Sequence, residues 1–237
     1  MKKVKRIALV VLGTTSLATA QAQDDSFETT IETDVVSNYI WRGQKLGEVS
    51  LQPTLGVSWH GLSLTAWGSV GLSDQNDAKE FDLTLGYETG GFRAAVTDYF
   101  ISDHTDQTPY FCYRSGRTAH VFEGTVGYDF GWFSLQWNTV FAGADGKTKS
   151  GKRAYSSYAE VSVPFRLGGC QWKATVEAVP YATDYYADAK GFAVTHVGLR
   201  AEKELTLSQS FRLPLFAGIY ANPSTEKAYY VIGFTIR

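Results

Sequence analysis

The side chains of this sequence that could do chemistry are titratable groups of both signs, set within runs where polar and apolar residues alternate. They share the polar parity of those runs and are Glu32, Asp34, Arg42, Asp82, Arg93, Glu123, Glu160, Arg166, Lys173, Glu177, His196, Arg200 and Arg212. A space lined by interleaved acids and bases is either a hydrophilic passage that selects its solutes or a filled interior in which the charges pair. Both interpretations stay open on the sequence.

Other chemistry has little support. A lipid hydrolase needs a His and a Ser on one outward face, because the nucleophile must lie within hydrogen-bond reach of its base. No His-x-Ser occurs, and the four histidines stand in unrelated places: His60, His104, His120 and His196. We therefore predict no enzymatic activity.

The sequence also offers little evidence for a metal-binding site. Two acidic groups lie in predicted loops, one with Asp103, His104 and Asp106 and the other with Asp74, Asn76 and Glu80. The second lacks the Gly and the closing Glu of a calcium loop, and no zinc spacing or phosphate loop is present. We predict no metal and no cofactor.

The elements that position the charged groups are about twelve runs with a period of two. They cover residues 27–41, 50–59, 62–72, 79–88, 92–101, 119–128, 132–141, 153–165, 170–181, 192–204, 210–221 and 226–237. Most are long for a soluble strand and match a tilted membrane strand of ~9–11 residues. Ten strands is the alternative count, because the fifth and tenth runs are the least regular.

The connections alternate in length along the whole chain. Tight turns, most of them with Gly, cover 60–61, 89–91, 129–131, 167–169 and 205–209, and longer segments cover 42–49, 73–78, 102–118, 142–152, 182–191 and 222–225. Short turns at one end and long loops at the other are typical of an outer-membrane barrel with periplasmic turns and extracellular loops.

The two faces of the runs differ sharply. One carries Leu, Ile, Phe and Val, whereas the other is mostly Gly, Ser and Thr with scattered charges of both signs. A water-exposed sheet face normally carries many Lys and Glu, so a secreted sandwich or lipocalin-like barrel is the less favoured alternative. Aromatic residues at both strand ends predict interfacial girdles, with Tyr39, Trp41 and Tyr99 assigned to the outer one. We predict an all-β, transmembrane, antiparallel up-and-down β-barrel.

The first 22 residues predict a secretory signal peptide. Four basic residues precede a short apolar run, and small residues favour cleavage after Ala20 or Ala22, which leaves residues 23–237 as the barrel. Loss of the four basic residues changes the formal net charge from −2 to −6, which argues against nucleic acid as a partner. Cys112 and Cys170 fall at opposite ends of the predicted barrel, so we expect no disulfide between them.

The stretch Asp34-Val35-Val36-Ser37-Asn38-Tyr39-Ile40-Trp41-Arg42-Gly43 resembles the first-strand signature of the TorF-like porins, a family of bacterial outer-membrane barrels of unknown function. Gln44 and the run 51–55, which contains Pro53, fit the segment that follows it. The resemblance covers about the first thirty mature residues. It implies a pore in the bacterial outer membrane and supplies no catalytic residues.

The predicted function is a porin or channel for small hydrophilic solutes, with outer-membrane lipid as its surroundings. The alternative is a non-conducting barrel with a charge-filled lumen that acts structurally or binds at the surface through its extracellular loops. Loop residues with aromatic and basic side chains are Tyr110, Phe111, Tyr113, Arg114, Arg117, Tyr185 and Tyr186. They could dock carbohydrate or protein, or fold into the barrel mouth and narrow it, and we favour the second role.

Overall fold

The computed structural model describes residues 27–73, 77, 79–102, 108–148, 150–186, 189–208 and 211–237. The predicted signal peptide, residues 1–22, lies outside the described residues. So do Asp74, Asn76, Asp103, His104 and Asp106 of the two acidic loop groups.

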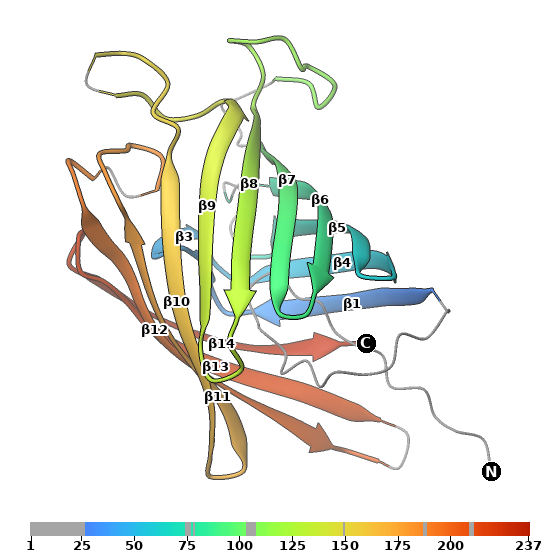
Figure 1. Ribbon diagram of the computed structural model, residues 1–237. Coiled ribbons are helices and arrows are strands. Elements are labelled where there is room, and N and C mark those ends of the chain that lie inside the picture. The colour runs from blue at the N-terminus through green and yellow to red at the C-terminus, as the bar shows by residue number, and fades with distance from the viewer. Residues whose placement is uncertain are drawn as a thin grey trace.

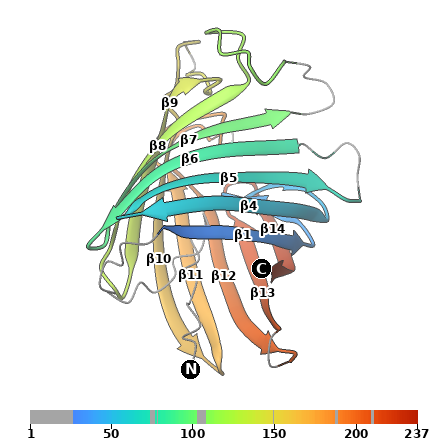
Figure 2. The same cartoon turned by 90° about the vertical axis from the view of Figure 1, so that its right-hand side faces the viewer.

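Twelve strands form a closed barrel in which every neighbouring pair is antiparallel (Figures 1 and 2). They are β1 (Glu28–Val36), β4 (Ser50–Trp59), β5 (Leu62–Gly71), β6 (Lys79–Thr89), β7 (Phe92–Ser102), β8 (His120–Asp129), β9 (Ser134–Gly143), β10 (Ser157–Leu167), β11 (Cys170–Val179), β12 (Ala193–Thr206), β13 (Arg212–Asn222) and β14 (Lys227–Ile236). Neighbours in sequence are neighbours in the barrel, and β1 closes it by pairing with both β4 and β14. The prediction of twelve strands in an up-and-down barrel is confirmed.

A second, two-stranded sheet is formed by β2 (Tyr39–Trp41) and β3 (Gln44–Gly47). The sequence prediction assigned residues 39–41 to the end of the first barrel strand, and that assignment is wrong. These residues belong instead to a hairpin that is separate from the barrel sheet.

The tight turns follow from local backbone chemistry. His60 and Gly61 both have positive φ, 49° and 83°, as a two-residue hairpin turn between right-twisted strands requires. A side chain at Gly61 would overlap the Glu88 carbonyl of the next hairpin. The longer connections emerge at the opposite end of the barrel, where Figure 1 shows the β7–β8 and β9–β10 loops above the strands.

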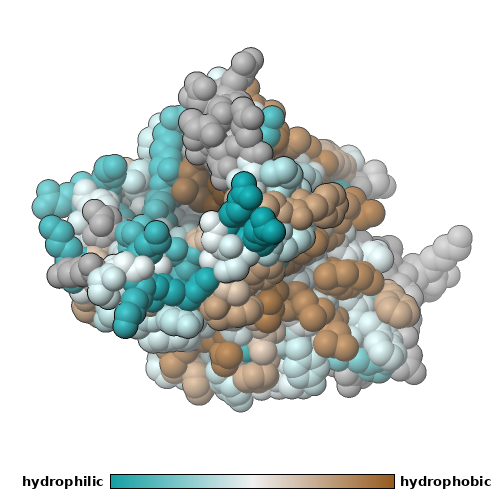
Figure 3. All heavy atoms as spheres, turned by 90° about the horizontal axis from the view of Figure 1, so that it is seen from above, coloured by the Kyte–Doolittle hydropathy of each residue, from teal (hydrophilic) through white to brown (hydrophobic). Residues whose placement is uncertain are grey.

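The outer surface of the barrel is apolar and the inner surface is polar. Leu64 and Ile232 are 52% and 62% exposed, whereas Asp82 and Thr84, on the opposite parity, are 5% and 6% exposed. Figure 3 shows apolar side chains spread over the strands of one side of the molecule, with hydrophilic groups gathered elsewhere. An apolar surface of this extent is unfavourable in water and matches a hydrocarbon environment, so the fold is that of a transmembrane barrel.

Among the residues that the structure describes, no helix is long and apolar enough to cross a membrane.

Candidate functional site: a hairpin inside the barrel lumen

The chain leaves the barrel wall at Ser37 and Asn38, inside the stretch that resembles the TorF-like signature. The Ser37 hydroxyl accepts a hydrogen bond from the Ile232 backbone N–H at 3.0 Å, and the Asn38 side-chain amide donates to the Tyr230 carbonyl at 3.0 Å. The Ser37 backbone N–H also donates to the Ile232 carbonyl at 2.9 Å, and beyond it the contact with β14 continues through the Asn38 side chain. The strand predicted over 27–41 therefore stops here, and the chain turns inward.

The tip of the β2–β3 hairpin is packed against the inside of the barrel. Arg42 and Gly43 have φ of 47° and 76°, the paired positive values of a two-residue turn. A side chain on Gly43 would overlap the Thr195 carbonyl of β12, and the Asn222 side-chain amide of β13 donates to the Gly43 carbonyl at 2.9 Å. Only glycine fits this position, because both the backbone angle and the space exclude a Cβ.

Arg42 reaches from the hairpin to Glu123 on β8, which lies on the far side of the barrel from β1. Its two terminal nitrogens donate to the two carboxylate oxygens at 2.5 and 2.7 Å. The same carboxylate accepts the Tyr186 hydroxyl at 2.6 Å and the Tyr99 hydroxyl at 3.1 Å. Glu123 is 0% exposed. A buried ion pair is tolerated only when its remaining hydrogen-bonding capacity is satisfied, and here four bonds satisfy the carboxylate.

Aromatic rings enclose the Arg42 guanidinium. It lies 4.5 Å from the ring centres of Trp41 and Tyr158 and 5.1 Å from that of Tyr186. Burial is the largest single effect and disfavours the charged guanidinium, but Glu123, Tyr186 and Tyr99 together outweigh it and hold the pKa of Arg42 well above its usual value. Burial raises the pKa of the Tyr186 hydroxyl, so that group remains a donor. The hairpin tip is a charged, dry contact across the lumen.

The β11–β12 loop packs against the hairpin tip from the other side and closes the lumen together with it. Tyr186 and Ala189 are buried in a lumen cluster with residues of β7 to β11, and Trp41 and Tyr185 pack on it. The other buried members are Tyr99, Val121, Val140, Tyr158 and Val179. Tyr185 and Tyr186, which were candidates for surface binding, thus lie inside the barrel.

Deeper in the lumen, some of the predicted lining groups lie close to one another. The Lys173 ammonium lies 3.4 Å from the Glu160 carboxylate, and the His196 ring lies 3.6 Å from Glu177. Arg200 donates to Glu202, which follows it on the same strand, at 2.9 Å. These contacts lie along β10, β11 and β12, where acidic and basic side chains alternate on the inner face.

The opposite wall is acidic. Glu32 and Asp34 on β1, and Glu80 and Asp82 on β6, have no ion pair with a basic residue in the described part of the chain. Tyr39 donates to Glu80 at 2.8 Å, Thr235 donates to Asp34 at 2.6 Å, and Glu80 and Asp82 share a side-chain hydrogen bond. One oxygen each of Glu32 and Asp82 is buried without a hydrogen-bond partner among the described residues.

The remaining predicted lining residues stand toward the short-turn end. Arg93 lies 3.5 Å from Glu88 across the β6–β7 turn, and Arg166 is exposed near the β10–β11 turn. The Arg212 side chain is 66% exposed and donates to Glu204 at 3.0 Å. These groups surround the inner opening rather than the constriction.

The described part of the β7–β8 loop, residues 108–119, lies against the outside of the barrel, so the expectation that this loop folds into the barrel mouth is wrong. Tyr110 and Tyr113 contact outward-facing residues of β6, β7 and β8, and Phe111, Arg114 and Arg117 border a hollow on its surface. The loop holds one free thiol, Cys112, and the other, Cys170, lies at the opposite end of the barrel.

Sequence reasoning missed the aromatic part of the constriction. Trp41 and Tyr99 were assigned to an interfacial girdle and Tyr158 to no site, yet all three contact Arg42 or Glu123. The alternation of the strands could have identified two of them. Tyr99 faces inward with Thr97, and Tyr158 faces inward with Glu160. No local pattern marked Trp41, since its position depends on the inward turn.

Comparison with known proteins leaves the family open. No protein-family model matches the chain, and no curated protein matches it. Two solved structures are similar to it at low sequence identity. One is a mutant of Rh. blastica porin, 11% identical over 79% of this chain and 55% of the porin, with a TM-score of 0.39.

The second comes from work on the mechanism of in-meso crystallization of membrane proteins. It is 8% identical over 88% of this chain and 82% of the other, with a TM-score of 0.41. The chain spans about half the length of the porin that it matches. The resemblance to the TorF-like porins remains a prediction.

Proposed function

We propose that this protein is an outer-membrane channel for small hydrophilic solutes, closed in its outer half by the β2–β3 hairpin. One observation carries the proposal: a hairpin, fastened by the Arg42–Glu123 pair, crosses a lumen whose wall is polar apart from the cluster around Tyr158. A permanently filled interior would pair its charges throughout, whereas four carboxyl groups on one wall of this lumen have no ion pair among the described residues. We call the Arg42–Glu123 ion pair the latch. A polar lumen closed by this polar contact supports a passage that opens when the ion pair breaks.

The acidic wall supports a preference for cations. Glu32, Asp34, Glu80 and Asp82 face the lumen and have no ion pair among the described residues, whereas the groups on β10 to β12 include both acids and bases. Rings or patches of carboxyl groups attract cations in a narrow pore. We propose a bacterial outer membrane as the location, because the predicted leader and the separation of short turns from long loops both favour it.

The test is planar-bilayer conductance of purified, folded protein. The double variant Arg42→Gln, Glu123→Gln removes the latch charges without leaving one of them unpaired, and a second variant replaces residues 38–48 with a flexible Gly-Ser linker. We expect brief, small openings for the wild type, larger conductance for the double variant, and the largest for the linker variant. The reversal potential should show cation preference.

Lys45→Gln is the matched control. Lys45 belongs to the same hairpin, but its ion pair with Glu48 at 2.6 Å is exposed, so this variant should conduct like the wild type. Heat-modifiable gel mobility shows that each barrel is folded. A folded linker variant without discrete openings would defeat the channel proposal and leave the non-conducting, surface-binding barrel as the function.

A further inference from the structure

We propose that residues 108–117 of the β7–β8 loop form a binding site for a phosphate-bearing lipid of the outer leaflet, on the outside of the barrel wall. The site rests on the membrane location proposed above but not on channel activity. Its contacts are separate from those of the lumen hairpin, so lipid binding and conductance can be measured independently.

The loop is attached to the wall rather than to the barrel mouth. The Tyr110 ring lies 5.7 Å from Phe81 and 5.1 Å from Phe100, and the Tyr113 ring stacks on His120 at 4.2 Å with 26° between the planes. Phe81, Phe100 and His120 share the outward parity of their strands. The loop therefore covers a part of the surface that would otherwise face lipid.

A polar clasp fixes the loop in this position. His120 Nδ1 lies 2.7 Å from Asp98 Oδ1, and His120 Nε2 lies 2.5 Å from the Tyr110 carbonyl oxygen. Each ring nitrogen of His120 therefore has a hydrogen-bond partner. His120 is 0% exposed. The clasp explains how two polar residues occupy the apolar parity of β7 and β8 with no bulge in their pairing.

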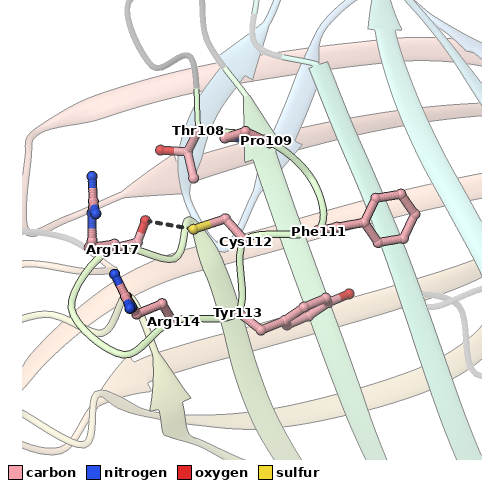
Figure 4. Close-up of a pocket in the computed structure, with 7 residues that line it drawn as sticks. All are labelled: Thr108, Pro109, Phe111, Cys112, Tyr113, Arg114 and Arg117. Carbon is pink, nitrogen blue, oxygen red and sulfur yellow. Dashed lines mark hydrogen bonds between the residues drawn. The ribbon is translucent and has the colours of Figure 1, made fainter.

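The exposed side of the loop is hollow and basic. A cavity of about 640 Å³ is lined by Thr108, Pro109, Phe111, Cys112, Tyr113, Arg114 and Arg117. Figure 4 shows Arg114 and Arg117 on one side of the loop, with Phe111 and Tyr113 on the other. A backbone bond from Arg117 N–H to the Arg114 carbonyl, 3.0 Å, holds the two arginines in one turn. Neither forms an ion pair with an acid in the described part of the chain.

A second hollow adjoins the first on the wall itself. It has a volume of about 330 Å³ and is lined by Lys79, Glu80, Phe81, Phe100, Ser102 and Tyr110. The Tyr110 and Phe111 rings, 5.1 Å apart, connect the two hollows. Phe111 is 84% exposed, the position expected of an aromatic ring at a membrane interface.

The chemistry of the two hollows matches one amphipathic ligand. Two arginines in one turn suit a phosphate, whose oxygens accept bidentate hydrogen bonds, and anionic headgroups attract basic side chains near the surface. The rings of Phe81, Phe100 and Tyr110 offer an apolar track continuous with the outer wall for an acyl chain. A soluble sugar or an acidic peptide would leave that track unused.

The experiment measures binding of phosphatidic acid to the full-length folded barrel in neutral-detergent micelles by native mass spectrometry. Phosphatidylcholine and inorganic phosphate are the comparison ligands. We expect Arg114→Gln, Arg117→Gln to weaken phosphatidic acid binding roughly tenfold or more, as two lost basic contacts at a headgroup predict. Phe111→Ser should weaken lipid binding and leave inorganic phosphate unaffected. Arg166→Gln, an exposed arginine at the opposite end of the barrel, is the matched control and should bind like the wild type.

Two results would overturn the proposal. In the first, the double Arg variant, folded by heat-modifiable mobility, binds phosphatidic acid as tightly as the Arg166 control. In the second, inorganic phosphate binds as tightly as the lipid and Phe111→Ser changes neither, which would make this a site for a soluble anion. Conductance of the double Arg variant should equal that of the wild type, so failure of the channel proposal leaves this test intact.

Discussion

Two clusters of arginine and aromatic residues lie on opposite faces of the same pair of strands. On the inner face, Glu123 of β8 binds Arg42 and also accepts the hydroxyl of Tyr99 of β7. On the outer face, His120 of β8 and Asp98 of β7 hold the loop that carries Arg114 and Arg117. Adjacent residues, Asp98 and Tyr99, therefore serve different clusters, because successive side chains of a strand point to opposite faces.

The difference between the clusters shows how surroundings decide what an arginine does. Arg42 is enclosed by aromatic rings and bound by a fully buried carboxylate, so its charge is neutralised within the protein and cannot bind a ligand. Arg114 and Arg117 border an open hollow without an acidic partner among the described residues. Similar residue types thus make a latch on the inside and a docking surface on the outside.

The largest expected effect is on the inner latch. Glu123→Gln leaves the Arg42 charge buried without its counterion, and we expect it to lower the free energy of unfolding by about 3–5 kcal/mol. Adding Arg42→Gln should restore part of that loss, because no buried charge then remains unpaired. Denaturant unfolding in micelles, arranged as a double-mutant cycle, measures both values. Additive effects of the two substitutions would show that the pair is not coupled.

A smaller effect is expected from the hydroxyl groups around Glu123. Tyr186→Phe removes the 2.6 Å bond to the carboxylate and should cost about 1.5–3 kcal/mol, the range for a hydrogen bond to a charged group. Tyr99→Phe, with the longer 3.1 Å bond, should cost less. Tyr230→Phe, on the exposed outer face, is the control and should leave unfolding unchanged. Equal losses from all three would contradict a specific role for these bonds.

The smallest effect on the whole barrel is expected from the outer clasp. His120→Gln removes the ring that joins Asp98 to the Tyr110 carbonyl, so the loop should detach while the barrel stays folded. Limited trypsin digestion at Arg114 and Arg117 should become several-fold faster, with the free energy of unfolding changed by only about 1 kcal/mol. His60→Gln, in a short turn at the other end, should be cut at the wild-type rate. Unchanged cleavage in His120→Gln would show that the clasp does not hold the loop.

The sequence was sufficient to predict the barrel. Period-two alternation sets which residues face inward. Tight turns such as His60-Gly61 can be recognised because they contain a glycine, which adopts positive φ readily. Strand number, antiparallel order and the polar inner face all follow from these local signals. They can be read locally because each depends on residues close together in the chain.

Only the tertiary structure decided where the connecting segments go. The latch joins Arg42 to Glu123 across 81 positions of sequence, and Tyr186 reaches the same carboxylate across 63. The stretch 39–43 has good strand composition, yet it turns inward, where Asn222 binds the Gly43 carbonyl and Glu123 binds Arg42. The loop with Tyr110 and the loop with Tyr186 have similar aromatic composition, but one lies outside the wall and the other inside. Composition does not distinguish them, since the side on which a loop packs depends on partners that only the closed barrel brings together.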